Sequence, residues 1–353
     1  MDTLTQAALG ATVGQALYAR RLGRKANWYG ALGGLLPDFD VVFGALTDEW
    51  GGLVWHRGPS HALWFGPVLG PLLGWLCWRW YRRKREDLPP GVPDAGAREA
   101  LPAWIGLWIL AILTHPLLDV CTTYGTQLLA PFDRTRYAID AVSIIDPLYT
   151  GVLALALIIG WKSRRHPARA ARAGLAALAL STAYLAYGLL QNHTARDLAT
   201  ADLAARQQSP DRVDAYPTFF QPWLRRLVAW YPDHLEIGAI STLRPRPITW
   251  TRVDRPQDPA IDAVLAHPHG QIFRWFANDR LVARLRPVDG GTEVDLGDYR
   301  YGDLQDPARA LWGIRATVAP DGKIIDGPTR YRNPRAAAIG PALRQLWDST
   351  FPD

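Results

Sequence analysis

Long apolar runs, all of which lie before residue 191, are the feature that most limits how this chain can fold. They cover Leu4–Ala19, Trp28–Leu46, Ala62–Trp78, Ala103–Leu118, Pro147–Trp161 and Ala173–Leu190. A membrane-crossing helix needs about 20 largely apolar residues, with a range of about 17–25. The first two runs are rich in Gly and Ala, and Asp38 and Asp40 interrupt the second, so both are also compatible with buried or partly inserted helices. The pattern predicts a mainly α, polytopic membrane bundle of four to six helices, with six preferred.

Basic residues form short clusters between these runs, and their positions predict an orientation. Clusters at 20–25, 82–85 and 162–165 follow the first, third and fifth runs, so all three fall on one side if every run crosses. Short loops rich in Lys and Arg stay cytoplasmic. The N-terminus, the 47–60 and 119–146 loops and everything after Leu190 are then expected to face outward. The net charge of +6 is therefore read as loop charge that contacts membrane lipids, and no nucleic-acid partner is expected.

The chain changes character after about Ala195 and becomes polar, with frequent Pro, Gly, Asn and Asp. Alternating apolar and polar residues at 248–253, 271–276 and 281–285 predict short antiparallel strands. Residues 313–325 predict a hairpin that turns at Asp321-Gly322, and 335–351 predict a terminal helix. We therefore expect a membrane domain over residues 1–192 and a small soluble α+β, β-rich domain over 193–353.

Four clusters of ionisable residues in the membrane half are candidates for chemistry. They are Asp38 with Asp40, His56-Arg57 with His61, His115 with Asp119, and Asp146. His115 and Asp119 are one helical turn apart and point the same way. A neutral imidazole and a carboxylate on one face suit Zn²⁺, Mn²⁺ or Fe²⁺. The cysteines, Cys77 and Cys121, are only two, so no cysteine-based zinc site is expected.

Each cluster has a plainer structural interpretation. A His-x-x-x-Asp pair is commonly a hydrogen-bonded pair on a helix, and an Asp-x-Asp after proline is commonly a helix end. Ionisable groups within apolar runs nevertheless cost several kcal/mol and tend to be paired and functional. The orientation argument places all four clusters toward the same outward face, which favours a single site.

The ordered motifs resemble the YdjM-type inner-membrane metal-dependent hydrolases. The resemblance rests on Met1-Asp-Thr-Leu-Thr, Leu36-Pro-Asp-Phe-Asp40, His56-Arg-Gly-Pro-Ser-His61, His115-Pro-Leu-Leu-Asp119, Thr123-Tyr-Gly-Thr and Ile145-Asp-Pro. It covers residues 1–190 and implies an inner-membrane location. That family is considered similar to the zinc-dependent phospholipase C superfamily, which implies His115 and Asp119 as metal ligands, with His56, His61, Asp38 and Asp40 completing the site. Gln6 stands where members of the family usually carry His, which puts one metal position in doubt.

The leading hypothesis is metal-assisted hydrolysis of a phosphoester at the outward face, with a divalent metal, zinc favoured, and a lipid-linked substrate. Asp38, Asp40 or Asp146 would act as further ligands, as residues that orient histidine, or as the general base. Arg57 would neutralise a phosphate oxygen; its plainer role is to reach toward lipid headgroups. One alternative is a non-catalytic protein in which the polar cluster is structural and the C-terminal domain binds a partner or lipid. A second, less favoured alternative is an ion or proton transporter. No protein partner can be named.

Overall fold

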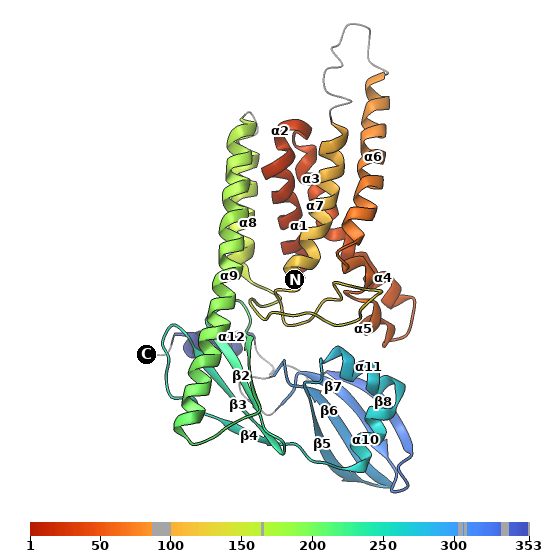
Figure 1. Cartoon of the computed structure of the whole chain (residues 1–353), viewed down its shortest axis with the longest axis vertical. Coiled ribbons are helices and arrows are strands. Elements are labelled where there is room, and N and C mark those ends of the chain that lie inside the picture. The colour runs from red at the N-terminus through yellow and green to blue at the C-terminus, as the bar shows by residue number, and fades with distance from the viewer. Residues whose placement is uncertain (87–99, 164–165, 303–305, 307–308, 333–338, 352–353) are drawn as a thin grey trace. The chain divides into compact units, whose positions relative to one another are not determined.

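The computed structural model describes residues 1–86, 100–163, 166–302, 306, 309–332 and 339–351 (Figure 1). Arg164 and Arg165 of the third basic cluster lie outside these residues. The chain divides into two compact units, the first made of Met1–Tyr187 with Phe219–Gln221 and the second of Gly188–Thr218 with Pro222–Asp353. About half of the chain is helical, and antiparallel sheets occur in the C-terminal unit.

The N-terminal unit is built from helices. In chain order they are α1 (Thr3–Val13), the π-helix η1 (Gly14–Tyr18), α2 (Ala19–Leu22), α3 (Lys25–Leu35), the 3-10 helix η2 (Leu36–Phe39), α4 (Asp40–Ala45), α5 (Gly51–Trp55), the 3-10 helix η3 (Pro59–His61), α6 (Phe65–Glu86), α7 (Leu101–Asp119), α8 (Pro147–Lys162) and α9 (Pro167–Ala205), which continues into the second unit. Helix α7 packs against α1, α3 and α6, and α1 also packs against α8 (Figure 1).

Among the described residues, two helices are long and apolar enough to cross a membrane by themselves. They are α7, with 19 residues, and α9, with 39, while α8 is apolar but has only 16 residues. The expected bundle of four to six spans is therefore not confirmed. The first two apolar runs are divided by the π-helix and the 3-10 helix, so that α1 and α3 are 11 residues each, and α6 ends in a charged stretch.

Helices α1 and α3 approach each other through paired glycines. A Cβ atom on Gly10 would lie 2.1 Å from the carbonyl oxygen of Gly30, and one on Gly30 would lie 2.2 Å from that of Gly10. One turn away on each helix, Gly14 meets the carbonyl of Ala26 and Gly34 meets that of Gln6 in the same manner. These are two Gly-x-x-x-Gly motifs that face each other, the arrangement that lets helix backbones pack closely in membranes. This close contact sets where the C-terminal end of α3 lies.

The C-terminal unit contains two four-stranded antiparallel sheets, each with its strands in sequence order. The first sheet comprises β1 (Arg212–Pro217), β2 (Leu224–Trp230), β3 (His234–Ser241) and β4 (Thr251–Asp254), and the second comprises β5 (Leu281–Val288), β6 (Gly291–Asp298), β7 (Trp312–Val318) and β8 (Ile324–Arg332). Ala195, Ala199 and Leu203, four residues apart on α9, pack with Leu227 and Ala229 of β2. A second core contains Val228 and Ile237 of the first sheet together with Val282 of the second.

The C-terminal unit contains the predicted hairpin and terminal helix but lacks one predicted strand. The hairpin at Asp321-Gly322 is confirmed, because β7 pairs with β8 and Gly322 has a φ of 82°. The predicted terminal helix is present as α12 (Ile339–Thr350), and residues 335–338 of that prediction lie outside the described residues. The predicted strand at 271–276 is wrong, because those residues belong to helix α11 (Pro268–Phe276), which follows the short helix α10 (Pro259–Ala266). Its buried residues, Gly270, Phe273 and Phe276, recur every three positions, which is a helical period.

Candidate metal centre

The histidine and aspartate clusters meet at one end of the helical unit. Asp38 comes from η2 at the end of α3, His61 from η3 before α6, and His115 from the last turn of α7. Ligand atoms of these three residues all lie within 4.8 Å of one another. A second group, formed by Asp38, Asp40 and His56, meets the same limit and shares Asp38 with the first. The structure therefore brings together residues separated by up to 77 positions in the chain.

The distances within the first group match those among ligands of one metal ion. The Nε2 atoms of His61 and His115 are 3.0 Å apart, and Oδ1 of Asp38 lies 3.3 Å from the His115 atom and 3.6 Å from the His61 atom. Ligands placed tetrahedrally at about 2.0–2.1 Å from zinc are about 3.3–3.4 Å from each other. Catalytic zinc sites have three protein ligands and leave a fourth position open. Two imidazoles and one carboxylate fit this pattern.

Hydrogen bonds on the other ring nitrogens fix which histidine atoms are lone-pair donors. Nδ1 of His115 lies 2.5 Å from the carbonyl oxygen of Gly34, which can only accept, so this nitrogen carries the proton. Nδ1 of His61 lies 3.2 Å from Oδ2 of Asp40, a carboxylate that holds the proton of His61 in the same position. When both rings are neutral, each Nε2 atom therefore carries a lone pair, and the two lone pairs face each other. Such second contacts are the usual way in which proteins orient metal-binding histidines.

A proton on His61 is the alternative to a metal ion at this point. Burial alone lowers the pKa of His61, but hydrogen bonds with Asp119, Asp38 and Asp40 outweigh it and raise that pKa to about 9. The same geometry therefore attracts positive charge of either kind. The carboxyl of Asp40 shows the reciprocal effect: burial raises its pKa, but hydrogen bonds from His56 and His61 hold it well below its ordinary value.

Asp40 is surrounded by donors on both oxygens. Oδ2 accepts hydrogen bonds from the backbone N–H of Arg57 at 2.8 Å and from the hydroxyl of Ser60 at 3.1 Å, in addition to its contact with His61. Oδ1 lies 3.0 Å from Nδ1 of His56. One carboxylate thus organises the whole loop from His56 to His61, including Arg57, whose φ is +58°.

Asp119 lies next to both histidines but is engaged elsewhere as well. Its Oδ2 lies 3.4 Å from Nε2 of His61 and 3.5 Å from that of His115, and 3.0 Å from Nε of Arg57. Its Oδ1 accepts a hydrogen bond from Gln6 at 3.0 Å and forms an ion pair with the buried amino group of Met1. Arg57 is itself only 3% exposed and also donates to the hydroxyl of Thr122 at 3.0 Å. Arg57 therefore does not reach toward lipid headgroups.

Asp146 lies apart from both metal-binding groups. It is the N-cap of α8: Oδ1 accepts from the backbone N–H groups of Leu148 and Tyr149, both at 3.1 Å, and Oδ2 accepts from the hydroxyl of Tyr184 at 2.8 Å. The Asp-Pro dipeptide at 146–147 is a helix-start signal that predicts such a cap. In the structure this carboxylate therefore caps the start of α8.

Sequence reasoning missed one member of the site, the amino group of Met1, and noted Gln6 as a metal position in doubt. The amino group of Met1 is buried against Asp119, and no sequence pattern signals such a contact. Gln6 points its Nε2 at Asp119 and at the carbonyl oxygen of His115, while its Oε1 is buried without a hydrogen-bond partner among the described residues. A buried acceptor without a donor fits a bound water or cation. Gln6 therefore lies at the site even though it replaces the histidine expected from the family.

Comparison with known proteins adds a family to this geometry. The sequence model of a family described as YdjM inner membrane protein matches residues 1–195, which is more than half of the chain. Inner membrane protein YbcI of Escherichia coli (strain K12) is 29% identical over 122 residues, which cover 35% of this chain and 61% of YbcI. The chain thus matches less than two thirds of that relative's length. No solved structure matches the chain.

Proposed function

We propose that this chain, which belongs to the YdjM inner membrane protein family, is a membrane-bound, metal-dependent hydrolase of phosphoesters. The observation that carries the proposal is the pair of imidazoles whose Nε2 atoms face each other at 3.0 Å beside the carboxylate of Asp38. Similarity to the zinc-dependent phospholipase C superfamily remains a prediction.

Asp38, His61 and His115 are the proposed ligands, with zinc as the favoured ion. A divalent cation supplies Lewis acidity toward a phosphoryl oxygen and lowers the pKa of water. The residues around the ligands hold them in place: Asp40 orients His61, and the carbonyl of Gly34 orients His115. His61 and His115 are fully buried, whereas the side chain of Asp38 is 20% exposed, so a substrate would approach from the side of Asp38.

We assign Asp119 and Arg57 to the support of the site. Arg57 neutralises Asp119 in a buried ion pair, so its guanidinium is not free to take a phosphate oxygen. Asp119 in turn contacts both histidines from the buried side. The sequence predicted Asp119 as a ligand and Arg57 as a phosphate contact; the ion pair between the two side chains favours a supporting role for both. Asp146 is left out because both of its oxygens serve the start of α8 and Tyr184.

His56 is the proposed proton-transfer group. Its Nδ1 is held 3.0 Å from Asp40, and its side chain is 27% exposed. A carboxylate that accepts from one ring nitrogen leaves the other ring nitrogen free to take or give a proton. Asp40 would then orient His56 as well as His61.

The surroundings of the site favour a lipid-linked substrate. Phe39, Phe43 and Leu46, which follow Asp38 along the chain, are 63%, 62% and 78% exposed. Large exposed apolar side chains beside a polar site mark contact with a membrane or with an apolar ligand. Although η1 separates α1 from α2, the three segments follow one another without a gap and together cover 20 residues, a length that fits a further membrane span. With the basic loops on the cytoplasmic side, the site and the C-terminal unit would face outward.

The test is hydrolysis of a phospholipid by the full chain in detergent micelles. Activity should disappear on chelation and return on addition of Zn²⁺. It should be lost in a His61→Ala, His115→Ala variant and kept in His166→Ala, which removes an exposed histidine of the basic loop. Activity that survives chelation, or that is unchanged in the double variant, would refute the hydrolase and favour a structural polar cluster.

A further inference from the structure

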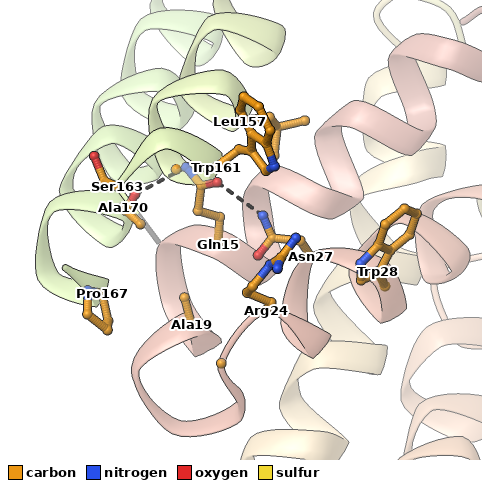
Figure 2. A pocket seen from close by; sticks show the side chains of 12 residues that line it. Gln15, Ala19, Arg24, Asn27, Trp28, Leu157, Trp161, Ser163, Pro167 and Ala170 are labelled. Atoms are coloured by element: carbon orange, nitrogen blue, oxygen red, sulfur yellow. Dashed lines mark hydrogen bonds between the residues drawn. The ribbon is translucent and has the colours of Figure 1, made fainter. Parts of the chain in front are cut away.

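A second polar pocket lies in the helical unit, at the end that carries the basic loops. It is a cavity of about 200 Å³ lined by residues of η1, α2, α3, α8 and α9 (Figure 2). Drug-sized ligand sites have volumes of roughly 300–1,000 Å³, so this cavity suits a small group rather than a whole lipid. None of the metal-site residues lines it.

The floor of this pocket is polar and tightly constructed. Gln15 is 1% exposed and donates from Nε2 to the carbonyl oxygens of Ala156 at 2.8 Å and Ala170 at 3.1 Å, while its Oε1 accepts from Asn27 at 3.0 Å. One side chain therefore links α8, α9 and α3, and Figure 2 shows how Gln15 lies between Asn27 and Ala170. Gln15 belongs to the π-helix η1, and π-helical turns are frequent at functional sites.

The rim carries positive charge and exposed tryptophans. Arg24 lines the pocket, and three more cations, Arg20, Arg21 and Lys162, are close in sequence to lining residues. Among the residues that the structure describes, no carboxylate forms an ion pair with any of these four cations. The sequence has no acidic residue from 3 to 37 or from 147 to 196. Trp28 and Trp161, both lining residues, are 70% and 60% exposed. Tryptophan at such a position suits the headgroup level of a bilayer.

We infer that this pocket binds the phosphodiester headgroup of an anionic phospholipid from the leaflet on the basic side. Arg24 pairs with the phosphate, Asn27 and Ser163 line the polar cavity, and the acyl chains lie outside it against Trp28 and Trp161. Basic pockets between membrane helices on the cytoplasmic side are where such headgroups bind. The inference is independent of the proposed hydrolase, because the two sites share no residue.

Native mass spectrometry of the detergent-solubilised full chain tests the inference, with dioleoyl-phosphatidylglycerol as the probe. Wild type should bind one phosphatidylglycerol more tightly than further copies, and dioleoyl-phosphatidylcholine should show no such first site. Arg24→Gln should weaken the first binding step about fivefold, the effect of one near-surface cation. Ala19→Phe, which fills part of the cavity, should weaken it at least as much. Arg82→Gln, on α6 at the same end of the unit, is the matched control and should bind like wild type.

The results that would overturn the inference are equally specific. Unchanged first-step binding in Arg24→Gln, or equal retention of phosphatidylcholine, would remove the site. Displacement of the lipid by the same concentration of glycerol 1-phosphate would assign the pocket to a soluble phosphate ester instead. Because Arg24 is exposed, its variant is expected to fold even if Ala19→Phe does not. Melting temperatures of all variants serve as the check on folding.

Discussion

The Nε2 atoms of His61 and His115 lie 3.0 Å apart. Because each Nδ1 carries the proton of its neutral ring and donates it in a hydrogen bond, both Nε2 atoms present a lone pair. Two lone pairs at that distance repel each other unless positive charge lies between or beside them. A metal ion meets this need, and a proton on His61 is its competitor. The polar cluster thus favours a positive charge between the two histidines, either a metal ion or a proton.

Competition between proton and metal predicts a pH dependence of metal affinity. The pKa of His61 is raised to about 9 in the metal-free protein, so zinc must displace a proton at lower pH. Zinc affinity should therefore rise about tenfold per pH unit up to about pH 9 and then level off. Chelator competition between pH 6 and 9 measures it. His61→Gln should lose this pH-dependent zinc binding, whereas His166→Ala should bind zinc with the same slope as wild type; a wild-type affinity independent of pH would contradict the account.

Asp40 should matter for metal binding without being a ligand. Asp40→Asn removes the carboxylate that orients both His61 and His56, and loss of such a partner typically lowers metal affinity about 10–100-fold. Asp133→Asn is a suitable control, since that carboxylate accepts hydrogen bonds from the nearby Thr135 and Tyr137 and belongs to neither candidate metal group. Isothermal titration with Zn²⁺ measures the difference. Complete loss of binding in Asp40→Asn would make Asp40 a direct ligand instead.

Substitutions of Asp38 and Asp119 should have different effects: the Asp119 variant should be less stable without metal, and the Asp38 variant should no longer be stabilised by zinc. Asp119→Asn leaves Arg57 buried without its counter-charge, which costs about 3–5 kcal/mol, so the metal-free protein should melt at a lower temperature. Asp38→Asn should leave the metal-free melting temperature nearly unchanged and abolish the increase that zinc gives. Equal destabilisation by both substitutions would show that Asp38 is structural.

Much of this architecture follows from the sequence, but the role of each carboxylate within the site does not. The apolar runs and the order of His and Asp motifs predicted a polar cluster in the membrane half. Which carboxylate lies beside both Nε2 atoms depends on tertiary contacts: Asp38 and Asp40 are two residues apart, yet only Asp40 is enclosed by Ser60, Arg57, His56 and His61. The cap at Asp146 was not predicted, although the proline that follows it is a helix-start signal. The helix at 268–276 was missed because four of the six residues at 271–276 are apolar, and so short an apolar segment also fits a strand.

The paired glycines of α1 and α3 link packing to the site, because Gly34 on α3 supplies the carbonyl that orients His115. In Gly30→Ala the new Cβ would meet the backbone of Gly10 at 2.2 Å, so the helices must separate. We expect a destabilisation of about 1–3 kcal/mol together with weaker zinc binding. Gly151→Ala on α8 meets nothing within 4 Å and should leave both unchanged. Thermal melting with and without zinc checks this, and an unaffected Gly30→Ala variant would contradict the close packing.

Metal content is the most direct measure of the central claim. Elemental analysis by mass spectrometry should find about one zinc ion, or another divalent transition metal, per chain in detergent-purified protein at pH 8. Asp38→Asn, His61→Ala and His115→Ala should each lose it, while His166→Ala keeps it. A wild type that stays without metal after incubation with Zn²⁺, or variants that retain as much metal as wild type, would contradict the claim that these three residues form a metal centre.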